Sequence, residues 1–209
     1  PEILAKAAFN HNIPFVLSTV TTASIESISE ITEGRAWFQL YHPAEERVTK
    51  DILKRAEAAH CPVLVILADV PSFGYRPRDI RNGLSMPPKM TISNIVSAMK
   101  RPHWALNTLI NGQPSFETLK PYMPKNLNLN ELATFMDATF SGRLDEDKIK
   151  RIRDLWKGKL VLKGAESIDD VEIAYRLGLD GVIISNHGGR QVDVGQATID
   201  SLKSIAPIY

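Results

Sequence analysis

The stretch PVLVILADV, residues 62–70, decides the fold, because it is a continuous apolar run that is rich in β-branched residues and ends on a carboxylate. Strands that are buried on both faces have this composition, and they occur in parallel sheets that helices cover. An amphipathic helix is predicted over 45–60, and a further strand, AWFQLY, over 36–41. Strand and helix therefore alternate, which predicts a parallel α/β fold.

The same alternation continues on both sides of this stretch. Ser167 is a candidate N-cap and Gly178 a candidate C-terminal stop for one of the predicted helices. The further strands are predicted at 13–18, 159–164 and 180–185, and the further helices at 24–32, 167–178 and 197–206.

Five strands suit either a doubly wound sheet or part of a (β/α)₈ barrel. The barrel is favoured because a polar side chain ends every predicted strand, and the carboxyl ends of barrel strands converge on one site. A doubly wound sheet more often concentrates its chemistry at one switch point. The strand-ending residues are Ser18, Gln39, Tyr41, Asp69, Lys163, Ser185 and His187.

A segment at about 71–145 separates the third predicted strand from the fourth, and it is too long for an ordinary connection. It is rich in proline, and in its early part apolar residues are interleaved with Lys and Arg. Two interpretations remain open: a lid over the mouth of the barrel, or a surface that contacts a membrane.

The composition excludes several classes of protein. The 209 residues are 44% hydrophobic and 23% charged, as in soluble globular proteins, and the net charge of +1 gives no reason to expect nucleic acid as a partner. A single cysteine, Cys61, predicts a reducing, cytoplasmic location. We expect no metal site, signal peptide or membrane-spanning helix. The opening Pro1 leads us to expect that the chain begins inside a longer protein.

The sequence IISNHGGRQVD, residues 183–193, holds the main candidates for chemistry. His187 follows an apolar strand and precedes two glycines, which permit a close approach to the backbone. A neutral imidazole there could accept a proton, with Asp69 as the carboxylate that orients it. The alternatives are a structural histidine, and for Asp69 a helix cap or turn residue.

Three further side chains complete the candidate site. Arg190 could bind a small carboxylate through its planar guanidinium, although most arginines simply lie at the surface. Tyr41 could add a hydroxyl to the same substrate, or could serve in packing. Lys163 ends an otherwise apolar strand, where a cation could favour an electron-rich cofactor ring or form a Schiff base.

The motifs SNHGGRQVD (185–193), LST (17–19), FQLY (38–41) and LVLKG (160–164) resemble those of the FMN-dependent 2-hydroxy acid dehydrogenases and oxidases. The segments at 74–83 and 101–106 resemble the membrane-associated lactate and mandelate dehydrogenases of that family. The resemblance implies an FMN-binding TIM barrel that oxidises an L-2-hydroxy acid to the 2-oxo acid.

Carried over by position, the resemblance makes His187 the active-site base and Asp69 its orienting carboxylate. It implies that Arg190 and Tyr41 bind the substrate carboxylate, and that Arg76 lines the same site.

The resemblance also implies a set of cofactor contacts and the walls of a substrate pocket. Lys163 would face the N1–O2 edge of the flavin. Val20 and Phe73 would bound the substrate side chain, with room for lactate or a somewhat larger acid. The remaining residues that would bind the flavin are Ser18, Gln39 and Ser185.

Two departures from the family pattern are evident. Leu67 stands where the family has a threonine that bonds the flavin. The first barrel strand and the last two strands, with the loops that bind the FMN phosphate, would lie outside residues 1–209. We therefore interpret the chain as the central part of one barrel domain.

The resemblance further implies a quinone, a cytochrome or oxygen as electron acceptor. It also implies contact with the inner membrane as a peripheral protein, and a homo-oligomer for the full-length protein. The alternative is a non-catalytic fragment that needs the missing segments or a partner to bind FMN.

Overall fold

The computed structural model describes residues 1–70, 81, 91–112, 115–125, 127–140, 144–191 and 195–208. These residues contain one parallel sheet whose spatial order, β1-β2-β3-β4-β5, is also the order along the chain. A doubly wound sheet reverses its strand order at a switch point, so this uninterrupted order supports the predicted barrel, here incomplete. The strands are β1 (Val16–Ser18), β2 (Trp37–Leu40), β3 (Val63–Leu67), β4 (Lys159–Ala165) and β5 (Gly181–Ile184).

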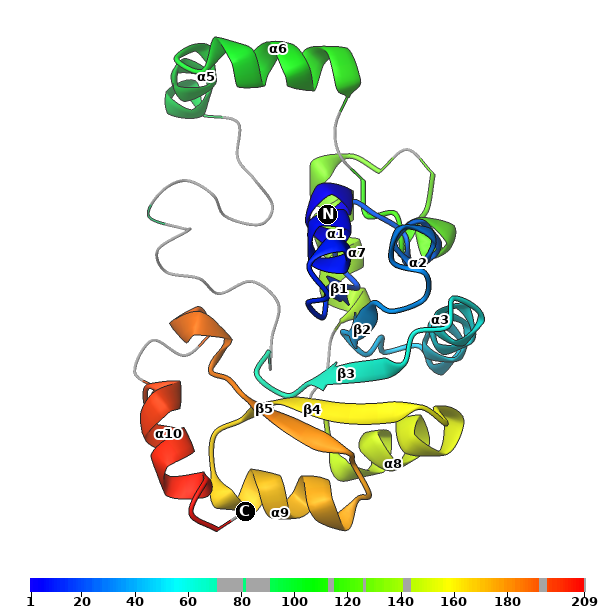
Figure 1. Ribbon diagram of the computed structural model, residues 1–209. Helices are drawn as coiled ribbons and strands as arrows, with labels where there is room; N and C mark the ends of the chain where they lie inside the picture. The colour runs from blue at the N-terminus through cyan, green and yellow to red at the C-terminus, as the bar shows by residue number, and fades with distance from the viewer. Residues whose placement is uncertain are drawn as a thin grey trace.

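Helices alternate with the strands along the chain and cover the sheet, and all of those that accompany the strands except α8 were predicted (Figure 1). One helix, α1 (Glu2–Asn10), precedes β1, and a short 3₁₀ turn, η2 (His187–Gly189), follows β5. The helices that accompany the strands are α2 (Ile25–Thr32), α3 (Glu46–Ala58), α8 (Glu146–Leu155), α9 (Ile168–Arg176) and α10 (Thr198–Ile205).

Local sequence signals fix where the helices begin and end. Ser24 caps α2, where its hydroxyl accepts from the Ser27 amide at 3.0 Å. Ser167 and Asp170 form a reciprocal capping box at the start of α9. Gly178 adopts φ +70° just after α9, a conformation that favours glycine. The predicted cap and the predicted stop of this helix are therefore both confirmed.

Helix α8 was not predicted from the sequence. Asp145 caps it, where its carboxylate accepts from the Lys148 amide at 2.8 Å. Ile149, Ile152 and Trp156 are buried at helical spacing, so the signal was present in the sequence. The strong positive and negative charge of the rest of the helix masked it.

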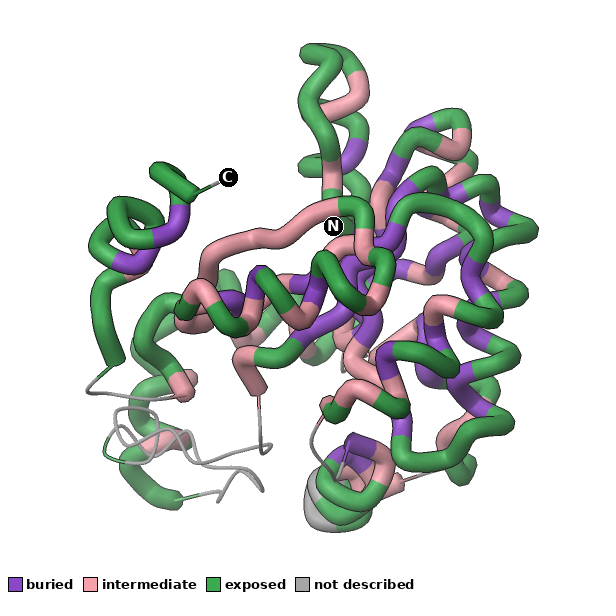
Figure 2. Tube along the Cα trace, turned by 90° about the horizontal axis from the view of Figure 1, so that it is seen from below, coloured by how far each residue is buried: buried purple, intermediate pink, exposed green. Residues whose placement is uncertain are grey.

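The main core lies between the sheet and the helices that cover it. Its fully buried members alternate along the strands, including Phe38 and Leu40 in β2 and Leu64 and Ile66 in β3. Figure 2 shows the buried residues running along the strands and along the helix faces that meet them. The intervening strand residues face the other side of the sheet, where the polar candidates lie.

The described part of the long segment falls into two regions of different character. Helices α5 (Ile92–Met99) and α6 (Pro102–Asn111) contain no buried residue, and they stand apart from the sheet in Figure 1. The residues from 115 onward behave differently, because Leu119 in the turn before η1 (Lys120–Tyr122) and Met136 in α7 (Leu129–Thr139) join the main core. Among the helices described for this segment, α5 and α6 are therefore the ones that lie apart from the core.

A β-bulge interrupts the pairing of β4 with β5. Lys163 pairs with Ile183, whereas Ala165 pairs with Ile184, so Gly164 is the extra residue. Gly164 has φ +106°, and a Cβ placed on it would lie 2.5 Å from the Asp69 amide nitrogen. Only a glycine therefore allows β4 to pass this close to the end of β3.

Candidate functional site

The strand register brings the predicted polar residues to one face of the sheet. Ser18 pairs with Gln39 and Gln39 with Val65, while Leu67 pairs with Lys163. Paired residues of a parallel sheet point to the same side, as do residues two apart in one strand. Ser18, Gln39 and Lys163 therefore share the face opposite the main core.

Asp69 is the centre of the candidate site. Its Oδ1 lies 3.1 Å from His187 Nδ1. Its Oδ2 accepts from Lys163 Nζ at 2.6 Å and from Ser185 Oγ at 2.5 Å. The Asp69 side chain is 3% exposed, so the carboxylate is almost wholly inside the protein and three donors from two other strand ends surround it. We call these four residues the Asp69 cluster.

This environment sets the charge of Asp69. Burial alone would raise the pKa of its carboxyl group. Hydrogen bonds from His187, Lys163 and Ser185, together with the charge of Lys163, outweigh burial and lower the pKa from 3.8 to about 2. Asp69 therefore remains a carboxylate at neutral pH, and a carboxylate beside Nδ1 favours the tautomer that carries its proton there.

His187 lies in an unusual backbone turn. His187, Gly188 and Gly189 have φ values of +56°, +67° and +69°. Asn186 holds the turn, since its Oδ1 accepts from the Gly189 amide at 3.2 Å and its Nδ2 donates to the Gln196 carbonyl at 2.9 Å. The two glycines of the motif thus permit a sharp change of direction directly after β5.

Gln39 carries a buried amide donor that is suited to a ligand. The residue is buried, and its side-chain Nε2 has no hydrogen-bond partner among the described residues. Buried amide groups are nearly always paired, because an unpaired one loses its hydrogen bonds to water without replacement. Gln39 lies beside Ser18 and on the same face of the sheet as Lys163. This position fits a polar ligand that lies across the ends of several strands.

Thr19 is a structural residue of this region whose role the sequence did not reveal. Its hydroxyl donates to the Gln39 carbonyl at 2.7 Å and accepts from the Tyr41 amide at 3.1 Å. The residue is fully buried. It therefore ties the end of β1 to the end of β2 and fixes the backbone on both sides of the Gln39 amide.

The predicted substrate residues are only partly brought together. Tyr41 is half-buried and packs edge-to-face on Phe140, with ring centroids 5.7 Å apart. Val20 packs on the rim of the main core. Arg190 is exposed, and it forms no ion pair with a described residue. Arg76 and Phe73 lie outside the described residues.

Two residues predicted to contact the flavin also bond to Asp69. The Ser185 hydroxyl and the Lys163 ammonium both donate to its Oδ2. Leu67, at the position of the family's threonine, is buried and apolar. The spacing along the chain revealed which strand ends carry polar groups, but not which groups bond to each other.

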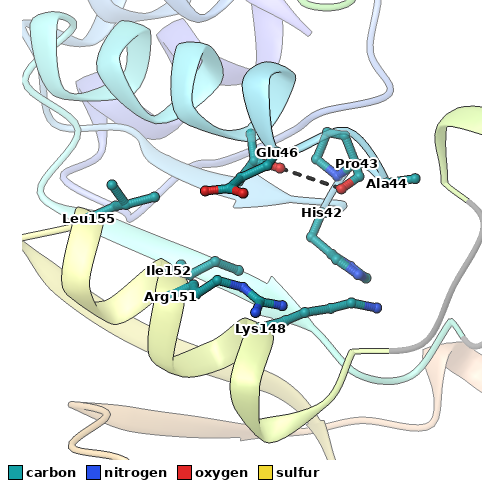
Figure 3. Close-up of a pocket in the computed structure, with 9 residues that line it drawn as sticks. His42, Pro43, Ala44, Glu46, Lys148, Arg151, Ile152 and Leu155 are labelled. Carbon is teal, nitrogen blue, oxygen red and sulfur yellow. Dashed lines mark hydrogen bonds between the residues drawn. The ribbon is translucent and has the colours of Figure 1, made fainter.

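A separate cavity of about 300 Å³ lies between the end of β2 and α8 (Figure 3). Burial and the nearby Lys148 ammonium lower the pKa of His42, which favours its neutral form. The cavity shares no residue with the Asp69 cluster. It is lined by His42, Pro43, Ala44, Glu46, Thr49, Lys148, Arg151, Ile152 and Leu155.

Comparison with known sequences gives a match over nearly the whole chain. The sequence model of the FMN-dependent dehydrogenase family matches residues 2–208. An L-lactate dehydrogenase of Haemophilus influenzae is 35% identical over 205 residues, and one of Vibrio parahaemolyticus is 36% identical over 203. These alignments cover 98% and 97% of this chain and 53% of each relative. The chain thus spans about half the length of the curated relatives it matches.

Comparison with solved structures agrees. The monotopic membrane protein (S)-mandelate dehydrogenase superposes with a TM-score of 0.86 at 30% identity, over 98% of this chain and 55% of that one. A mandelate oxidase superposes with a TM-score of 0.71 at 28% identity, over 98% and 49%. The chain therefore corresponds to about half the length of each of these two structures.

Proposed function

The chain belongs to the family of FMN-dependent dehydrogenases, and from this premise we propose that the protein containing it oxidises an L-2-hydroxy acid, of the lactate or mandelate type, to the 2-oxo acid. The observation that carries the proposal is the contact of the buried Asp69 carboxylate with His187 Nδ1 at 3.1 Å. A carboxylate on one ring nitrogen leaves the other, Nε2, available as a base for the substrate.

The residues present fit the cofactor of the family. FMN, when bound, supplies the acceptor for the two electrons that leave the substrate. Gln39 offers an unpaired buried amide donor, and Ser18 and Lys163 lie on the same face of the sheet. We assign these three residues to the flavin ring. The Lys163 ammonium would offset negative charge on that ring.

The substrate is held and deprotonated by side chains of this chain. Arg190, which is exposed and forms no ion pair in the described part of the chain, would pair with the substrate carboxylate. Tyr41, and Arg76 from outside the described residues, would add polar contacts, while Val20 and Phe73 would limit the size of the substrate side chain. His187 would accept the proton, and Asp69 would stabilise the imidazolium that forms.

Replacing His187 with Gln in the flavin-loaded protein tests the proposal. Gln keeps a polar side chain of similar size but cannot accept the proton. We expect FMN to remain bound, while its anaerobic reduction by L-lactate or L-mandelate becomes too slow to detect. Reduction at the wild-type rate would refute the role of His187, and a wild-type protein that no 2-hydroxy acid reduces would refute the activity.

The carboxylate clamp has its own test. Lys keeps the charge of Arg190 but loses the planar pair of donors, so Arg190→Lys should weaken substrate binding by roughly 10- to 100-fold. An unchanged Michaelis constant and turnover would contradict the assignment.

We further propose that α5 and α6 contact a membrane surface as a peripheral element. Six of their apolar side chains are more than half exposed, and Lys100 and Arg101 lie between the two helices. None of the helices in the described residues is long and apolar enough to span a bilayer.

The structural relative (S)-mandelate dehydrogenase is a monotopic membrane protein. This supports an electron acceptor in or on the membrane, such as a quinone or cytochrome, rather than oxygen. A cytoplasmic location and a homo-oligomer remain predictions.

A second candidate is that residues 1–209 alone do not hold FMN. In the described sheet, β1 and β5 each pair on one side only, and unpaired strand edges favour association. Flavin absorbance of the purified chain after soaking with FMN tests this candidate. A bound, reducible flavin would refute it.

A further inference from the structure

The Ser185 hydroxyl lies between the two groups that would perform the acid–base chemistry. Its Oγ donates to Asp69 Oδ2 at 2.5 Å and accepts from the His187 backbone N–H at 3.1 Å. A serine hydroxyl has one proton to donate and two lone pairs to accept with. The hydroxyl proton of Ser185 is therefore donated to the Asp69 carboxylate, and one of its lone pairs accepts from the backbone N–H of His187.

The contact to the His187 amide stabilises an unfavourable backbone conformation. A residue with a side chain at φ +56° is strained by contact of its Cβ with its own backbone. A hydroxyl that accepts from the amide two residues later is a local turn that holds such a bend. Ser185 thus determines the direction in which the His187 side chain leaves the strand.

The contact to Asp69 fixes the rotation of the carboxylate. Ser185 and Lys163 both donate to Oδ2, which leaves Oδ1 facing His187 Nδ1. The Lys163 side chain is 26% exposed and long, and under the proposed function its ammonium also serves the flavin. Ser185 is then the donor that holds Oδ2 independently of the cofactor.

Ser18 shows that the local turn does not by itself require a carboxylate. Ser18 also ends a strand, and its hydroxyl accepts from the Val20 amide at 3.3 Å, which is the same turn two residues long. Within the described residues Ser18 donates to no carboxylate. The bridge to Asp69 is therefore a feature of Ser185 beyond the turn.

We propose that Ser185 is a positioning residue for the base, which sets the Asp69 carboxylate and the His187 ring in the orientation needed for proton transfer. The inference rests on the proposed function. In this role Ser185 acts through Asp69 and His187, and its second lone pair stays available for the flavin contact expected from sequence.

The test compares three variants of the flavin-loaded protein. Ser185→Ala removes the bridge and should slow anaerobic flavin reduction by about 10- to 100-fold, with less than about a 2-fold change in the affinity for oxalate as an unreactive carboxylate. Ser185→Thr keeps the hydroxyl and should recover most of the rate. Ser29→Ala is the matched control. It also removes a part-buried hydrogen bond of a serine hydroxyl, here to the Ala59 carbonyl at 2.7 Å, but away from the site.

A second measurement does not depend on activity. In ¹⁵N-histidine-labelled protein, the His187 signal, assigned by its loss in His187→Gln, should show the proton on Nδ1. Ser185→Ala should give a mixture of tautomers, because it removes both bonds that hold the His187 backbone and the Asp69 carboxylate in register, and the ring and the carboxylate can then turn away from each other. Should Ser185→Ala not fold, Ser185→Cys provides a near-isosteric variant with a weak donor, for which we expect the same change in the tautomer.

The outcomes separate this inference from the proposed function. Unchanged reduction and unchanged ring signals in Ser185→Ala would overturn the inference. Weakened FMN binding with a normal reduction rate in the loaded fraction would also overturn it, since Ser185 would then be a flavin ligand only. If the wild-type protein fails to oxidise any 2-hydroxy acid, the proposed function fails, whereas the tautomer measurement still tests the bridge.

Discussion

The Asp69 cluster pairs its polar side chains inside the protein, whereas helices α5 and α6 leave their apolar side chains exposed. The cluster encloses a carboxylate that is 3% exposed and surrounds it with three donors from β4 and the end of β5. The two helices bury no residue and present Trp104 and Leu109 to the outside, 62% and 82% exposed. The first region pairs its polar groups within the protein, while the second leaves apolar side chains exposed among the described residues.

The largest effect should come from removing the charge at the centre of the cluster. Asp69→Asn keeps the shape of the side chain but no longer favours a proton on His187 Nδ1, and it leaves Lys163 without its partner. We expect anaerobic flavin reduction to slow by about 10²- to 10⁴-fold, as measured by stopped-flow absorbance.

Asp180→Asn is the matched control for that experiment. Asp180 also pairs with a lysine and an arginine, at 2.8 Å to Lys159 and 3.1 Å to Arg153, but away from the cluster. It should lower the melting temperature and leave the reduction rate of the folded protein unchanged. Equal loss of rate in both variants would mean that the cluster has no special role.

The next effect concerns the exposed helices. Burying a leucine side chain in an apolar phase contributes about 2 kcal/mol, so Leu109→Ser should weaken binding to anionic lipid vesicles by about 10-fold or more in a co-sedimentation assay. Tyr175→Ser is the control, because Tyr175 is 80% exposed on α9, outside these helices. Identical binding of wild type and Leu109→Ser would remove the case for a membrane surface here.

The smallest effect is on stability in acid. The pKa of Asp69 is lowered from 3.8 to about 2 in the folded protein, so the unfolded chain binds this proton at a higher pH than the folded one. The contribution of Asp69 is therefore complete above about pH 5 and is lost as the pH falls through 3.8 toward 2. By pH 3 the loss amounts to about 1 kcal/mol of the free energy of unfolding.

Urea unfolding at pH 6 and pH 3 measures that loss. Asp69→Asn has no carboxyl group to titrate, so its free energy of unfolding should fall by about 1 kcal/mol less than that of the wild type over this interval. Parallel curves for the two proteins would show that the surroundings of Asp69 do not hold its charge.

The fold was predictable because each strand is a short apolar run between recognisable helix signals. β3 and α9 appeared at nearly the predicted positions, the latter with its Ser167 cap. The family and the approach of Asp69 to His187 followed from motifs at strand ends. Helix α8 was missed, since its apolar positions are few and its charges many.

Apart from the contact of Asp69 with His187, the bonding within the cluster was not predictable. Whether Lys163 reaches Asp69 depends on the register between β3 and β4 and on the bulge at Gly164, and neither leaves a periodic signal in the sequence. Gln39 Nε2 has no partner among the described residues, and this likewise depends on burial between neighbouring strands, which the sequence does not reveal. Motifs thus identified the chemical groups, while their partners required three-dimensional distances.

The bulge at Gly164 has a consequence for protein engineering. A Cβ at this position would lie 2.5 Å from the Asp69 nitrogen and 2.7 Å from the Asp69 Cβ. A designer who copies only Asp69, Lys163, Ser185 and His187 onto a regular parallel sheet would reproduce the residue types and lose the distances. The smallest transplantable unit is therefore the ends of β3, β4 and β5 together, with the one-residue offset between β4 and β5 and its glycine.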